Sequence, residues 1–116
     1  MDIPRLTEQD LPDLLTSDRA TIVFKHSPYC VISTHAATEV ARFMLDAPDA
    51  RVKLVDVIAQ RPLSQQLAGT FRVPHASPQV LLVRGGIAHW HRSHSQITAV
   101  ALADATAETL GSGPQA

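Results

Sequence analysis

The single cysteine of the chain, Cys30, is the residue best suited to covalent chemistry. It follows the apolar run 21–24 and the polar stretch 25–29, and it precedes a helical pattern, so we expect it where a helix begins. The first N–H groups of a helix lack intrahelical partners, and the helix dipole is positive there. Both features favour the thiolate, which is the nucleophilic form of cysteine. The position therefore predicts a reactive thiol rather than a small buried apolar side chain.

Polar residues close to Cys30 in the sequence would assist such a thiol. Ser33 lies three residues further on, so its hydroxyl is within reach of the sulfur as a hydrogen-bond donor. Lys25 and His26 would add positive charge nearby. Because the chain has one cysteine, any disulfide must be formed with another molecule.

A second register of the same residues is open. The stretch Ser27-Pro28-Tyr29-Cys30 resembles the Cys-Pro-Tyr-Cys motif of dithiol glutaredoxins with its first cysteine replaced. In that register Ser27 opens the helix, and Cys30 occupies the resolving position one turn into it. The six residues from Phe24 to Cys30 are long enough for the chain to leave a strand before the helix starts, which favours the first register.

A proline marks the start of a later apolar run. Ser77-Pro78 precedes the run 80–83, and proline is tolerated at the first position of a strand but not in its middle. X–Pro bonds are the common place for a cis peptide, although most of them are trans. A cis bond here would leave the backbone of Ser77 free to pair with an incoming peptide or thiol, and the sequence leaves the isomer open.

The elements that must position these residues alternate between helices and strands. The apolar runs 21–24 and 80–83 lack polar alternation, which is typical of strands buried on both faces. Strand–helix–strand units predict parallel pairing, whereas Gly85-Gly86 predicts a hairpin turn and an antiparallel pair. The expected order is a capped helix from Thr7 to Leu15, strand 21–24, a helix from Cys30 to about Leu45, strand 52–57, a helix from Pro62 to about Phe71, strands 80–83 and 87–91, and a helix over 98–110.

The composition is that of an ordinary globular protein of 116 residues, 45% apolar and 18% charged. We expect one domain over residues 1–110 and a flexible C-terminal tail over 111–116. A net charge of −1 and 4% aromatic residues argue against a nucleic-acid partner. No signal-like start and no apolar run of the ~20 residues that a bilayer requires are present. One cysteine fits a reducing compartment, so we expect a cytoplasmic monomer without membrane contact.

Several segments, taken in order, resemble the monothiol bacilliredoxins of the YtxJ type. The resemblance runs from about Leu11 to Leu102. It is carried by Phe24-Lys25-His26-Ser27, by Cys30, Ile32 and Ser33, by Ser77-Pro78-Gln79-Val80-Leu81-Leu82, and by Trp90-His91 with Ser93-His94.

This resemblance implies a thioredoxin-like α/β fold, with a central four-stranded mixed sheet flanked by helices on both faces. It also implies reduction of mixed disulfides between proteins and bacillithiol, a low-molecular-weight thiol. Cys30 matches the reactive cysteine, Ser33 the serine that replaces a resolving cysteine, and Pro78 the cis proline of the fold. Val31 departs from the proline that usually follows the cysteine in the family, and its N–H is left to bond a thiolate, which leaves the reactivity open.

Seven residues are expected to line the thiol pocket or its rim. Three histidines can be considered as metal ligands. His89, His91 and His94, even together with Cys30, do not have the paired spacing of a zinc site. We therefore predict no metal and no cofactor, with the small thiol as co-substrate and S-thiolated proteins as partners. The expected pocket residues are His26, Tyr29, Val31, Ser77, Pro78, His91 and His94.

Two functions remain open for such a thiol. The first is a thiol–disulfide exchanger that turns over with a small thiol. The second is a thioredoxin-fold binding or redox-sensing module whose cysteine is capped under oxidative stress. The fold alone does not separate them, and turnover does, because a sensor stays modified until something else restores it.

Overall fold

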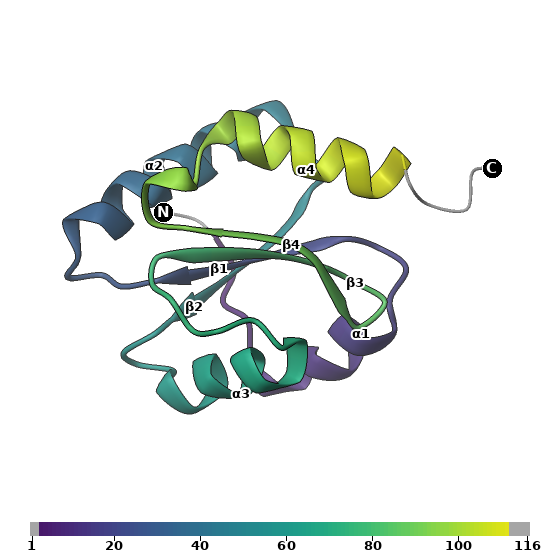
Figure 1. Ribbon diagram of the computed structural model, residues 1–116, viewed down its shortest axis with the longest axis horizontal. Coiled ribbons are helices and arrows are strands. Elements are labelled where there is room, and N and C mark those ends of the chain that lie inside the picture. Colours follow the sequence, from purple (N-terminus) through teal and green to yellow (C-terminus); the bar gives the residue numbers. More distant parts are fainter. Residues whose placement is uncertain (1–2, 112–116) are drawn as a thin grey trace.

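The computed structural model describes residues 3–111 and has a four-stranded sheet between two helical layers (Figure 1). Helices α2 (Val31–Asp46) and α4 (Ala99–Gly111) cover one face. Helices α1 (Leu11–Thr16) and α3 (Arg61–Phe71) cover the other. The predicted α/β class, with a mixed sheet and helices on both faces, is confirmed. Gly111, predicted as the first residue of the tail, is the last residue of α4, and the rest of the predicted tail, 112–116, lies outside the described residues.

The strands lie in the order β2-β1-β3-β4. Strands β1 (Thr21–His26) and β2 (Arg51–Asp56) pair in parallel, as the strand–helix–strand rule predicts. The same expectation is wrong for β3 (Gln79–Arg84), which runs antiparallel to β1. The hairpin partner β4 (Ile87–Ser93) is antiparallel to β3, as predicted.

The reversed direction of β3 comes from the connection that follows α3. Arg72 adopts a left-handed conformation with φ 56° and ends the helix. The connection 72–78 then returns to the side of the molecule where β1 ends, as Figure 1 shows. Strand β3 therefore starts beside the end of β1, and this places Pro78 close to the Cys30 loop.

The hairpin turn uses two glycines in conformations with positive φ, 59° at Gly85 and 79° at Gly86. Residues other than glycine rarely adopt positive φ, which explains why glycine occupies both positions. Strand β4 carries one extra residue, because Leu82 pairs with Trp90 and Val83 with Ala88. His89 is left without a cross-strand partner, so the bulge interrupts the alternation along the strand.

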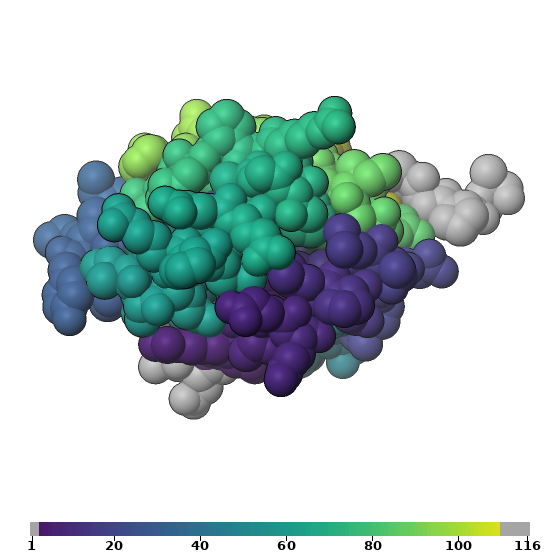
Figure 2. Space-filling view, turned by 90° about the horizontal axis from the view of Figure 1, so that it is seen from below, coloured from purple at the N-terminus to yellow at the C-terminus, as the bar shows by residue number. Residues whose placement is uncertain are grey.

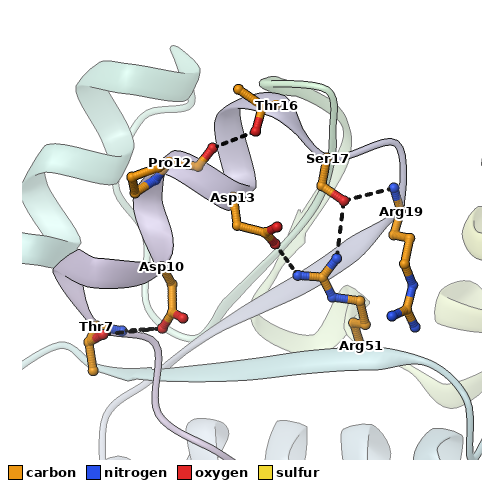
Figure 3. Close-up of polar contacts among 8 residues, drawn as sticks. All are labelled: Thr7, Asp10, Pro12, Asp13, Thr16, Ser17, Arg19 and Arg51. Atoms are coloured by element: carbon orange, nitrogen blue, oxygen red, sulfur yellow. Dashed lines mark hydrogen bonds and ion pairs between the residues drawn. The ribbon is translucent and has the colours of Figure 1, made fainter.

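The first helix is capped as predicted, although it starts as a 3-10 turn, η1 (Glu8–Asp10). The backbone N–H of Thr7 donates to the carboxylate of Asp10 at 2.8 Å (Figure 3). Arg51 of β2 binds Asp13 of α1 and also donates to Ser17. These contacts fasten α1 to the sheet at the end remote from Cys30.

Alternate residues of β1 serve two separate cores. Ile22 and Phe24 pack with α2 and α4, and Val23 packs with α3. Lys25, the next residue on the α3 face, is fully buried in a position that the pattern reserves for an apolar side chain. Within residues 3–111, no helix has the length and hydropathy that a membrane crossing requires.

Candidate active site

Cys30 is the N-cap of α2, with φ −111° and ψ 125°. Its N–H donates to the Ser27 carbonyl at 3.2 Å, and its own carbonyl accepts the Thr34 N–H at 3.0 Å. The thiol is free and half-buried. Since the helix begins at Val31, Cys30 is not one turn into it, and the glutaredoxin-like register is wrong.

Ser33 is fully buried in the first turn of the same helix. Its Oγ accepts the Ser27 N–H at 2.9 Å and lies 2.8 Å from Nδ1 of His26. In the described part of the chain no hydrogen bond joins this hydroxyl to the sulfur of Cys30, so the donation expected from the spacing is wrong. Ser33 instead fastens the end of β1 and the following loop to α2.

His26 belongs to β1 rather than to the expected loop, and its ring packs on Phe24 with centroids 5.4 Å apart. Burial lowers the pKa of His26, opposed in part by the charge of Asp56 and the contact with Ser33. Asp56 is the partner of His26 across the parallel pair. The charge of Asp56 thus acts on His26 from the end of the neighbouring strand.

Asp56 is the last residue of β2 and is itself buried. Its Oδ1 accepts the N–H groups of Ile58 and Ala59, both at 2.9 Å, and its Oδ2 lies 3.5 Å from Arg5. Burial alone would raise its pKa, but the bonds from Ala59 and Ile58 and the charges of Arg5 and His26 lower it below the ordinary value. Asp56 therefore stays ionised next to His26.

The Ser77–Pro78 peptide bond is cis, as the resemblance implies. The register that pairs Lys25 with Gln79 puts Pro78 one step further along, beside His26. The Pro78 carbonyl accepts the N–H of His94 at 3.0 Å. The structure thus brings His26, Pro78 and His94 to one edge of the sheet.

Ser77 adds an unpaired polar group to this edge. Its Oγ is buried and has no hydrogen-bond partner among the described residues. Buried polar atoms are almost always paired, so an unpaired hydroxyl calls for an explanation such as a ligand. The short turn η2 (His94–Gln96), whose first residue bonds Pro78, packs against α2.

The other predicted pocket residues stand at the rim or apart from it. Tyr29 and Val31 flank Cys30 and are 86% and 84% exposed. His91 is exposed on β4, opposite Leu81, and within residues 3–111 no hydrogen bond or ion pair joins it to the Cys30 loop. Within residues 3–111, no group of three or more His, Cys, Asp or Glu side chains lies together as metal ligands would.

Lys25, predicted to add positive charge near the thiol, instead points to the opposite face of the sheet, where it meets Ser64 and His75, two residues that sequence reasoning missed. Nζ of Lys25 donates to the Ser64 carbonyl at 3.0 Å and lies 3.4 Å from Nδ1 of His75. Burial lowers the pKa of Lys25 to about 8. The available signal was the period of two, since Lys25 follows Val23 on the face that packs against α3.

Comparison with known proteins agrees with this geometry. The family model described as monothiol bacilliredoxin BrxC matches residues 5–102. A solved structure described as an oxidoreductase with a thioredoxin fold is 28% identical to this chain and has a TM-score of 0.79. The match covers 89% of this chain and 91% of that protein.

Two thioredoxins show the same fold at lower identity. Thioredoxin from Trypanosoma brucei brucei is 12% identical, with a TM-score of 0.76 and 95% and 92% coverage of this chain and its own. Oxidised mitochondrial thioredoxin 3 from Saccharomyces cerevisiae is 16% identical, with a TM-score of 0.71 and 91% and 94% coverage. Likeness at this level concerns the fold alone.

Proposed function

Since this chain belongs to the monothiol bacilliredoxin family, we propose that it removes a low-molecular-weight thiol, bacillithiol, from protein mixed disulfides through Cys30. The family and the fold support a thiol oxidoreductase. The observation that carries the proposal is the position of the chain's one thiol, which is half-buried at the N-cap of a sixteen-residue helix. The nearby cis Ser77–Pro78 bond adds support.

The chemistry proceeds by two exchanges. The Cys30 thiolate attacks the small-thiol sulfur of the mixed disulfide, so that a new S–S bond forms as the old one breaks. The target protein leaves as a thiolate and takes up a proton. A second small thiol, as its thiolate, then attacks the sulfur of the small thiol held on Cys30. Cys30 is released reduced, and the two small thiols leave joined as their disulfide.

The surrounding residues position this exchange in the proposed scheme. Ser33 holds the Cys30 loop through Ser27 and His26. The backbone of Ser77, which precedes the cis bond, is left to pair with the incoming disulfide or its peptide. Tyr29 and Val31 offer apolar contact at the exposed rim. These roles need no cofactor besides the small thiol.

The setting that we propose follows the same chemistry. A single free cysteine in exchange with a small thiol suits a reducing cytoplasm. The partners are S-thiolated proteins, and we propose that the chain acts as a monomer, without nucleic acid or membrane.

The test is release of bacillithiol from a reporter protein that carries it as a mixed disulfide, with reduced bacillithiol in excess. We expect many releases for each molecule of this protein, since a second thiol regenerates Cys30. Release of no more than one equivalent, with Cys30 left modified, contradicts the proposal and favours a redox-sensing module.

A further inference from the structure

A cavity of about 230 Å³ lies beside α3, on the face of the sheet opposite to α2. It is open to solvent next to the connection between β2 and α3. Its wall is formed by Val57, Ile58, Arg61, Ser64, Gln65 and His75.

The wall of this cavity carries positive charge and no carboxylate. Behind it, Nζ of the fully buried Lys25 reaches the Ser64 carbonyl and Nδ1 of His75. Burial lowers the pKa of His75, and the charges of Lys25 and Arg61 lower it further. Among the described residues, no carboxylate lies within salt-bridge distance of Lys25, Arg61 or His75. Three basic side chains thus converge without a negative partner.

The polar groups of the cavity are arranged to donate. Because Nδ1 of His75 accepts from the Lys25 ammonium and also lies 3.4 Å from the Ser64 hydroxyl, the ring proton of a neutral His75 belongs on Nε2. Arg61 offers only donors, and so does Lys25. The neighbouring acid Asp56 is occupied by Arg5 and two backbone N–H groups. Ser64 and Gln65 are neutral and can also donate, so a wall with positive charge and several donors suits a carboxylate.

The cavity lies within reach of the reactive thiol. Val57 in its wall donates its N–H to the His26 carbonyl at 3.0 Å. Cys30 follows His26 by four residues, which span at most about 14 Å. Figure 2 shows the start of α2, in blue, at the same end of the molecule as α3, in teal. A molecule of the size of a small peptide can therefore span both places.

We propose that this cavity binds the carboxylate end of the low-molecular-weight thiol whose sulfur is exchanged at Cys30. This inference rests on the proposed function and specifies the substrate class: small thiols with a carboxylate, in preference to neutral ones. Arg61 and His75 contact the carboxylate, and Lys25 supplies charge from behind.

The first test compares two disulfides by the rate at which Cys30 gains mass. Oxidised bacillithiol carries carboxylates, and 2-hydroxyethyl disulfide carries none. In Arg61→Gln the rate with oxidised bacillithiol should fall about ten-fold, as expected for one charge-assisted hydrogen bond, and the rate with 2-hydroxyethyl disulfide should change less than about two-fold. The control Arg19→Gln, at the opposite end of the sheet, removes the same charge and should affect neither rate.

Equal effects on both disulfides, or no effect on either, overturn the carboxylate site. They leave the proposed function intact, because that function is tested by the reaction and turnover of wild-type Cys30 and not by the difference between Arg61→Gln and its control. A second readout is independent of the thiol. In Cys30→Ala, oxidised bacillithiol should shift the amide NMR signals of Ile58, Arg61 and Ser64 in a saturable way, and unchanged signals there overturn the proposal.

Discussion

Lys25 and His26 are neighbours in β1, yet their side chains enter different environments. His26 faces α2, where the Ser33 hydroxyl, the ring of Phe24 and the charge of Asp56 meet it. Lys25 faces α3, where it meets a backbone carbonyl and a second basic side chain, and it forms no salt bridge among the described residues.

The difference separates two tasks at one edge of the sheet. On the α2 face, polar contacts are paired and hold the loop that carries the thiol. On the α3 face, a buried cation has no negative partner. Burying an unpaired charge costs free energy unless a ligand of opposite charge binds beside it. The reactive cysteine that the family and the fold imply lies on the α2 face. On the α3 face we place the recognition of the small thiol.

The largest expected effect is loss of the thiol. Cys30→Ala should abolish disulfide exchange completely, because the chain has no second cysteine. The side chain is half-buried and makes no capping hydrogen bond, so the free energy of unfolding should change by less than about 1 kcal/mol. Exchange kinetics and denaturant unfolding of the same preparation measure both quantities. Residual exchange at the wild-type rate would contradict the role of Cys30.

The next effect concerns stability on the α3 face. The fall in the pKa of Lys25 from 10.5 to about 8 corresponds to about 3 kcal/mol of cost for the buried ammonium. Lys25→Met removes that cost and two hydrogen bonds, so we expect about 1–3 kcal/mol of net stabilisation at pH 7. Thermal and denaturant unfolding measure it, and a destabilised variant would contradict the uncompensated charge.

The pH dependence gives the same prediction a second signature. Between pH 8 and 10.5 the unfolded chain binds the Lys25 proton more tightly than the folded chain does. Wild-type stability therefore carries a contribution that rises with pH across this window. The advantage of Lys25→Met should shrink over the same window, whereas a constant difference would show that the charge is not responsible.

A smaller effect is expected from the hydroxyl on the α2 face. Ser33→Ala leaves the Ser27 N–H without its buried partner and breaks the contact with His26, which should cost about 2 kcal/mol. The neighbouring Thr34 is a matched control, since its exposed hydroxyl bonds only the Cys30 carbonyl. Thr34→Ala should cost less than about 0.5 kcal/mol. Equal losses in the two variants would remove the special role of Ser33.

The smallest effect is a change in the titration of His26. Its folded pKa lies below the ordinary 6.5 because of burial, so stability is lost as the pH falls from 6.5 through the folded value. Asp56→Asn removes the charge that partly opposes this shift and should lower the pKa of His26 further. NMR titration of the ring measures it, with Asp46→Asn, at the far end of α2, as the control. A raised or unchanged pKa would contradict the coupling.

Much of this layout followed from local patterns. The place of Cys30 at a helix start came from the apolar run before it and the helical pattern after it. The turn at Gly85 and Gly86 came from the need for positive φ. Such features depend on a few adjacent residues, so a single sequence contains the information.

Other features depend on residues distant in the chain. The direction of β3 is set by the connection 72–78, whose return path has no local signature. The period of two along β1 could have predicted that Lys25 is buried. Its contacts could not be predicted in this way, because Ser64 and His75 lie 39 and 50 residues away in the sequence. The hydroxyl of Ser33 was assigned to the sulfur because spacing gives reach and not direction.

The most direct test of the central claim is the intact mass of the reduced native protein mixed with oxidised bacillithiol and followed over time. We predict addition of one bacillithiol, located at Cys30 by fragmentation, and its loss when reduced bacillithiol is added in excess. Addition only in denaturant, or no addition, would show that Cys30 is not a working thiol and would contradict the account.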